Sequence, residues 1–230
     1  MPLVWLVDRG CHGVGRALSE AVLASGDRLV AIARRPERIA GPIDRHGRRR
    51  SAAVPDVTDP TTARDAVAAA VAAFGRLDVV VSCAAAAARL GSIEETPLDV
   101  LESQAAAALW RPLHVIRAAL PVMRAQGSGH IVQLAGADGR APTWGLDGLL
   151  EELAAQVAPS GVRVTIVQSG GVRTVRRALG GGTGVALRDG APAGDHPPVV
   201  EAVLGLAREA RPPTRLTLGK DPARAGASRE

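Results

Sequence analysis

A glycine-rich stretch near the start of the chain carries the first residues that could bind a ligand. Residues 3–7 form an apolar run of strand length, Gly13 and Gly15 follow, and helical periodicity then begins. A strand, a glycine turn and a helix in this order direct backbone N–H groups toward the turn. We therefore predict a phosphate or pyrophosphate site here, in which Arg9 stands where a tight turn favours glycine.

Three side chains in or near this turn could take part in chemistry. His12 could act as an acid or base, or it could be a solvated turn residue. Cys11 and Cys83 end neighbouring strands of the predicted fold, so the two thiols could approach each other beneath the site. Each could be a nucleophile with His12 as its activating partner, or a small buried apolar residue. These residues lack a fourth ligand and a recognisable ligand spacing, so we predict no metal site.

Short apolar runs alternate with stretches of helical periodicity along the chain. The predicted strands are residues 3–7, 28–33, 52–55, 77–83, 129–134, 162–167 and 216–218. The predicted helices begin near residues 13, 60, 98, 144 and 199, with a kink or a helix start at Pro112. This alternation predicts an α/β fold with a doubly wound parallel sheet, whose ligand crevice lies at the carboxyl ends of the strands. We assign residues 1–222 to one domain and residues 223–230 to a flexible tail.

The composition excludes several classes of protein. Hydrophobic residues make up 47% of the chain and charged residues 22%, as in ordinary globular proteins. We find no apolar run of membrane-spanning length and no secretion pattern, and two cysteines do not make a disulfide framework. We therefore expect a cytoplasmic protein without a membrane partner. A formal charge of +5 and 2% aromatic residues, without basic–aromatic interleaving, predict no nucleic-acid partner.

Several short segments follow the pattern of one enzyme family. They are residues 7–15, 33–36, 56–59, 75–78, 127–132, 158–164 and 170–174. On these segments the sequence resembles the short-chain dehydrogenase/reductase family over nearly its whole length. The resemblance implies a single Rossmann-type domain with a mostly parallel seven-stranded sheet. In ordinary members it also implies hydride transfer from a nicotinamide cofactor to a carbonyl.

The reacting residues of that family do not match. Its serine falls on Ala135 and Gly136, and its helix asparagine falls on Ala108. Its tyrosine has no counterpart because the chain contains no tyrosine, and Thr143 stands near the place of its lysine. The segment before Trp144 is also several residues short. Reduction in this family needs a phenol as proton donor, a lysine that lowers the pKa of the phenol, and a serine that holds the substrate oxygen. We therefore predict that standard carbonyl reduction is lost.

The residues that would bind the cofactor match better. The matching positions are Gly13 and Gly15 in the turn, Arg34 and Arg35 where the family reads a 2′-phosphate, and Asp56 at the adenine contact. Arg9 replaces the first glycine of the family's turn. Its side chain could pair with a pyrophosphate, or it could fill the space that the cofactor needs. We predict that no cofactor is bound, and that the cofactor is NADPH if the nucleotide crevice is open.

Asp138 is the ionisable residue nearest to the missing serine. It lies two positions beyond Gly136, on a loop that lines the substrate pocket in the related enzymes. A partly desolvated carboxylate there could serve as a general acid or base, or it could pair with Arg140 or cap a turn. We take Asp138, His12 and Cys83 as the candidate catalytic residues.

Three functions remain open. The first is a redox-neutral enzyme of bacterial specialised metabolism that catalyses a cyclisation, dehydration or isomerisation. Its substrate would be a small apolar molecule, because the alanines at 84–88 and the shortened segment near Gly136 suggest an enlarged apolar pocket. The second is a non-catalytic partner protein, and the third is an NADPH-dependent reductase with a relocated proton donor. The resemblance implies a homodimer or homotetramer, with subunit contacts near Trp110, His114 and Arg117.

Overall fold

A single parallel sheet forms the centre of the molecule. The computed structural model describes residues 1–10, 13–33, 39, 41, 45, 51–54, 60–83, 92–136, 141–169 and 197–218. The strands are β1 (Val4–Val7), β2 (Arg28–Ile32), β3 (Ser51–Val54), β4 (Val79–Cys83), β5 (Gly129–Gly136), β6 (Val162–Ser169) and β7 (Arg215–Leu218). They lie in the order β3-β2-β1-β4-β5-β6-β7, and every pairing is parallel. This confirms the predicted doubly wound α/β fold.

The central strands are apolar on both sides because helices cover both faces of the sheet. The side chains of β1, β2 and β4 are almost all buried. Along β1, Leu6 lies between Val30 and Val80, and Val7 lies between Ala31 and Val81. The chain builds the sheet outward from β1 to β3 and then returns to β4. The direction of winding therefore reverses between β1 and β4, and ligands of such sheets bind beyond the carboxyl ends of the strands at this point.

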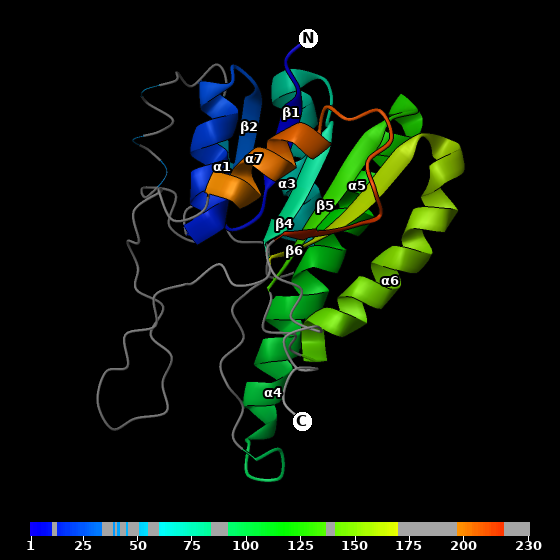
Figure 1. Ribbon diagram of the computed structural model, residues 1–230. Coiled ribbons are helices and arrows are strands. Elements are labelled where there is room, and N and C mark those ends of the chain that lie inside the picture. The colour runs from blue at the N-terminus through cyan, green and yellow to red at the C-terminus, as the bar shows by residue number, and fades with distance from the viewer. Residues whose placement is uncertain are drawn as a thin grey trace.

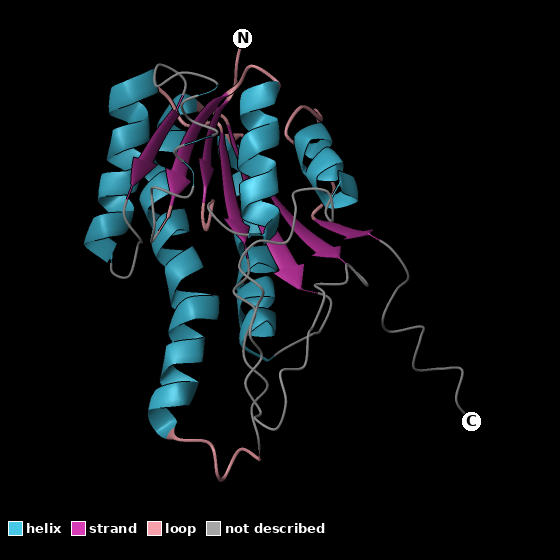
Figure 2. Cartoon of the chain, turned by 90° about the vertical axis from the view of Figure 1, so that its left-hand side faces the viewer, coloured by secondary structure: helices cyan, strands magenta, loops and turns pink. Residues whose placement is uncertain are grey.

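Described helices cover both faces of the sheet and form two outer layers (Figures 1 and 2). On one face lie α1 (Gly13–Ala24) and α7 (Pro197–Leu206), which pack on the side of β1 that presents Trp5 and Val7. On the other face lie α3 (Pro60–Phe74), α5 (Arg111–Gln126) and α6 (Ala141–Val157). The alternation of buried side chains along each strand therefore supplies two separate apolar cores.

One long helical rod extends past the sheet toward the bottom of Figure 1. It consists of α4 (Leu98–Ala105), a π-helical turn η1 (Ala106–Trp110) and α5. The N–H group of Arg111 bonds the Ala106 carbonyl five residues earlier. Pro112 has no N–H group that could bond the Ala108 carbonyl. The wider π-helical turn just before the proline lets the helix continue without a break. The rod therefore continues through Pro112 instead of starting there.

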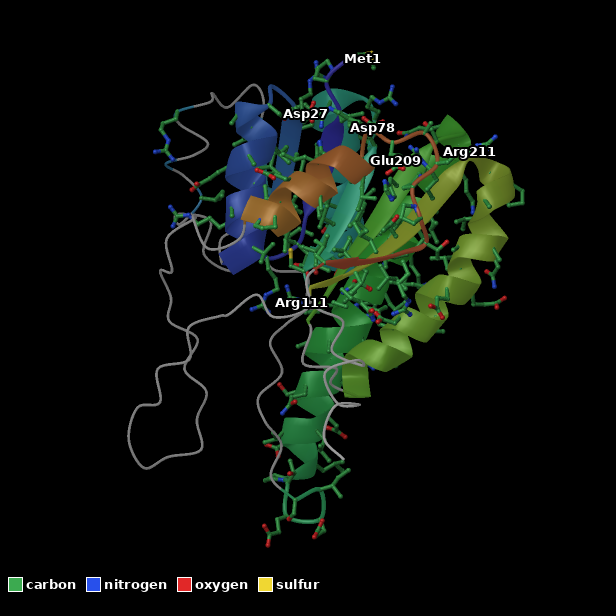
Figure 3. The ribbon with its side chains drawn as sticks, in the orientation of Figure 1. Met1, Asp27, Asp78, Arg111, Glu209 and Arg211 are labelled. Atoms are coloured by element: carbon green, nitrogen blue, oxygen red, sulfur yellow. The ribbon has the colours of Figure 1, made fainter. Side chains whose placement is uncertain are left out.

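Two buried carboxylates anchor the opposite end of the sheet, near the N-terminus. Asp27 accepts hydrogen bonds from Leu3 N (3.0 Å), Trp5 Nε1 (3.0 Å) and Arg208 (2.7 Å). Asp78 accepts one from Val4 N at 2.9 Å. Figure 3 shows both aspartates at the N-terminal end of the molecule and Arg111 far from them, at the carboxyl edge.

Among the ranges that the structure describes, no helix has both the length and the apolar character needed to cross a membrane. The predicted tail, residues 223–230, lies outside those ranges.

Candidate functional site

The turn after β1 requires glycine at several positions. A Cβ atom on Gly15 would lie 2.5 Å from the Arg9 carbonyl oxygen, and one on Gly10 would lie 2.9 Å from the Ala31 Cβ atom. Gly13 begins α1 with φ +46°, a backbone conformation that favours glycine. The turn therefore has the compact backbone that the sequence predicts, and the unbonded N–H groups of the first turn of α1 follow it directly.

Arg9 adopts a backbone conformation that favours glycine, although it carries a long cationic side chain. Its φ is +56°, which makes it the one non-glycine residue with positive φ among the described positions. An L residue in the left-handed region pays roughly 1 kcal/mol or more for its Cβ atom. The side chain of Arg9 is half-buried beside the turn. The turn has thus kept a conformation that suits glycine while placing a long side chain next to the predicted phosphate position.

A buried ion pair joins the end of β1 to the start of α5. Arg111 Nη2 donates to Asp8 Oδ1 at 3.1 Å, and the side-chain exposures are 9% and 3%. The two residues are 103 positions apart in the sequence. They meet because α5 packs on β4 and β5, with its N-terminal end beside the carboxyl end of β1. The sequence analysis did not find this pair.

Cys83 ends β4 next to the same charges. It is almost completely buried, and burial raises the pKa of its thiol to about 12, with the Asp8 carboxylate adding to the rise and Arg9 opposing it. A thiol with this pKa stays protonated near neutral pH, whereas the nucleophilic form is the thiolate. Cys83 therefore suits a packing role here better than nucleophilic attack.

The end of β5 presents methyl groups where the resembling family has polar ones. Ala135, one of the two residues on which the family's serine falls, is 4% exposed, and Ala108, at the asparagine position, is 2% exposed and lies in the π-helical turn. Neither alanine can donate a hydrogen bond from its side chain.

A further buried carboxylate lies on α6, and the sequence pattern did not predict it. Asp147 on α6 is 5% exposed and hydrogen-bonds the side chain of Gln168, which is the register partner of Ala135. Its Oδ2 atom lies 3.9 Å from Arg215 on β7, and its Oδ1 atom has no hydrogen-bond partner in the described structure. Burial raises the pKa of Asp147, while Arg215 and Gln168 oppose the rise.

The helical pattern explains why Asp147 was missed. Leu149 belongs to the leucine pattern of α6, yet it is 50% exposed, whereas Asp147 is turned toward the sheet. An aspartate inside a leucine-rich helix is normally assigned to the solvent face, because burying a carboxylate is costly. The pattern therefore held no signal that could have identified this residue.

Several candidate residues lie outside the described ranges. They are His12 and Asp138 from the catalytic set, Arg34, Arg35 and Asp56 from the cofactor set, and Cys11. Their roles stay predictions. Within the described ranges, no three histidine, cysteine, aspartate or glutamate side chains come together in a way that could hold a metal ion.

Comparison with known proteins adds family information. A family model described as short chain dehydrogenase matches residues 4–179. The chain is 32% identical over 248 residues to the oxidoreductase BOA17 of Botryotinia fuckeliana, with 96% of this chain and 90% of that protein covered. It is 28% identical over 221 residues to the oxidoreductase claN of Passalora fulva, with 91% and 94% covered.

Solved structures show the same fold. A short-chain dehydrogenase from Streptomyces avermitilis superimposes with a TM-score of 0.81 at 28% identity, covering 98% of this chain and 91% of that one. A metagenomic short-chain oxidoreductase in complex with NADP superimposes with a TM-score of 0.77 at 21% identity, covering 95% and 97%.

Proposed function

Because this chain belongs to the short-chain dehydrogenase family, we propose that it is a member that has kept the family's fold and lost its hydride transfer. It catalyses instead a redox-neutral step, a cyclisation, dehydration or isomerisation, on an apolar intermediate of specialised metabolism. One observation carries this proposal: the family's serine falls on Ala135 and Gly136, and its helix asparagine falls on Ala108, in a chain without tyrosine. Without the phenol, a carbonyl that receives hydride has no proton donor of the family's kind.

The proposal extends to the cofactor. The turn fits a pyrophosphate in its backbone, since Gly13 and Gly15 are in place. At position 9 the turn does not fit a pyrophosphate, because a half-buried arginine replaces the family's glycine there. We therefore propose that the protein works without a nicotinamide cofactor, and that Arg9 occupies space the cofactor would need.

Replacing Arg9 with glycine tests the cofactor proposal. We expect Arg9→Gly to bind NADPH at least tenfold more tightly than the parent in calorimetry, because the obstructing side chain is gone. The variant should also be more stable by about 1 kcal/mol, since glycine removes the left-handed strain. Arg16→Ala is the matched control, because it removes an exposed arginine near the same turn. Tight NADPH binding by the parent, weakened in Arg9→Gly, would show that Arg9 holds the phosphates.

Proton exchange tests the redox-neutral step itself. An enzyme that isomerises or cyclises carbonyl compounds removes a proton next to the carbonyl group. We expect the protein in D₂O, without any nicotinamide nucleotide, to speed deuterium incorporation into apolar cyclic ketones, as followed by NMR. Catalysis by a general acid or base contributes about a hundredfold to ten-thousandfold in rate. The absence of exchange across a broad ketone panel would favour a partner protein, and reduction of the ketones to alcohols with NADPH would favour a reductase with a relocated donor.

An exposed stripe on the helical rod supports the expected self-association. The outer side of the helical rod carries exposed residues at helical spacing, namely Asp99, Ser103, Ala106, Trp110, Arg117, Pro121 and Arg124. α4 buries none of its own residues, and Trp110 is 53% exposed. The rod is acidic at one end, aromatic at its centre and basic at the other end. Antiparallel pairing with a second copy would match acid to base on both sides of Trp110.

We propose that the chain forms a homodimer through this stripe, in line with the expected homodimer or homotetramer. Sedimentation of the Trp110→Glu variant tests the dimer, because a charge at the centre of an apolar contact should dissociate it. A parent protein that sediments as a monomer would rule the dimer out.

A further inference from the structure

Asp147 is a buried carboxylate whose capacity to accept hydrogen bonds is not fully used in the described structure. Three neighbours face it: Gln168 from β6, Arg215 from β7 and Glu151 from the next turn of α6. Arg215 is shared, because its Nη2 atom bonds Glu151 at 2.5 Å while its Nη1 atom lies 3.9 Å from Asp147. The stronger contact therefore goes to Glu151, and Asp147 Oδ1 is left without a partner in the described structure.

Such an arrangement is costly for stability. A buried carboxylate without its hydrogen bonds loses its hydration and gains little in return. Asp27 shows the usual solution in the same molecule, since it is equally buried but accepts three hydrogen bonds, from Leu3, Trp5 and Arg208. A group that is kept at a cost to stability, near a site, is a candidate for function.

The place of Asp147 in the fold is a second argument for a catalytic role. Gln168 pairs in register with Ala135, one of the two residues on which the family's serine falls. The hydrogen bond between Gln168 and Asp147 therefore places the carboxyl near the end of β5. Arg215 keeps a positive charge nearby, which stabilises the ionised form between proton transfers.

We propose that Asp147 is the proton-carrying catalytic residue of this site, with Gln168 as its positioning residue. The inference rests on the proposed redox-neutral function and names its substrate class, an enolisable carbonyl compound. The carboxylate takes a proton from the carbon next to the carbonyl group, and the electron pair moves onto the carbonyl oxygen as an enolate. Return of the proton to another carbon of the same enolate system completes an isomerisation without oxidant or reductant.

Stability measurements separate this role from a structural one. If Asp147 merely anchored β7 through Arg215, Asp147→Asn would lower the melting temperature, as Asp27→Asn should. We expect the opposite sign, a rise of about 2 °C or more at pH 7, because asparagine carries no charge to bury. Glu151→Gln is the control for Arg215, since it removes the same partner from a half-exposed position and should lower the melting temperature slightly. A fall in the melting temperature of the Asp147→Asn variant as large as that of the Asp27→Asn variant would overturn the proposal.

Chemical labelling tests whether the carboxyl meets small molecules. A small apolar diazo amide esterifies protonated carboxyl groups, so at pH 6 we expect ester at Asp147 and none at Asp27 when the folded protein is mapped by mass spectrometry. An unlabelled Asp147 would overturn the proposal. Neither readout depends on turnover, so a failure here leaves the redox-neutral function standing, and absent proton exchange would leave these two results unchanged.

Discussion

Arg111→Met should cost about 3–5 kcal/mol of the free energy of unfolding, the largest effect we expect from a single substitution. The change removes the guanidinium 3.1 Å from Asp8 and leaves that carboxylate 97% buried beside the apolar end of β1. Methionine fills much of the arginine's volume, so the loss reports the charge and not a cavity. Urea unfolding followed by circular dichroism measures it.

Two controls define the origin of that loss. The exposed pair Arg16–Glu20 provides the first, because Arg16→Met should cost under about 1 kcal/mol. The second is Asp8→Leu combined with Arg111→Met, which removes both charges and should recover most of the stability. A cost below about 1 kcal/mol for Arg111→Met alone would mean that the buried pair does not hold β1 to α5.

Acid should destabilise the protein through one histidine at the other half of the sheet. His130 on β5 is 1% exposed, and burial lowers its pKa to about 4, with Arg163 adding to the fall. Its Nε2 atom lies 2.9 Å from Thr165 Oγ1, which donates its proton to the Pro213 carbonyl. Thr165 therefore accepts a hydrogen bond from His130, and the Leu206 backbone only partly opposes the lowering of the histidine pKa.

The sign of the pH dependence follows from the lowered pKa. The unfolded chain takes up the histidine proton below about pH 6.5, while the folded chain does so only near pH 4, so stability is lost as the pH falls between these values. The loss should reach about 3 kcal/mol. His130→Gln keeps a donor for Thr165 and removes the titration, so its stability should fall less over this range. Identical pH profiles for the two proteins would contradict the assignment.

The fold could be read from the sequence because its signals are local. Apolar runs such as Val79–Val81 predict strands buried on both faces, and the glycines of the first turn fix the strand–turn–helix unit. Contacts between distant residues leave no such signal. Asp8 and Arg111 are each unremarkable in their own segment, and only the packing of α5 on the sheet makes them a pair.

From the sequence, only the missing catalytic residues of the candidate site could be predicted. The absence of tyrosine is visible in the sequence, and the structure adds that Ala135 and Ala108 are buried at the two other positions. Asp147 could not be predicted, because helical periodicity assigns a polar residue to the solvent side. Its burial depends on Gln168, Arg215 and the way α6 lies on the sheet.

Hydride transfer is the most direct test of the central claim. The protein, in excess over NADPH, should be mixed with ordinary aldehydes, ketones and quinones while the absorbance of NADPH is followed. Because the chain has no tyrosine and the family's serine falls on Ala135 and Gly136, we predict no oxidation of NADPH above the rate without protein. Steady oxidation that rises in proportion to protein, yields the reduced carbonyl and disappears in an Asp147→Asn variant would contradict the account, because it would show a reductase whose proton donor has moved.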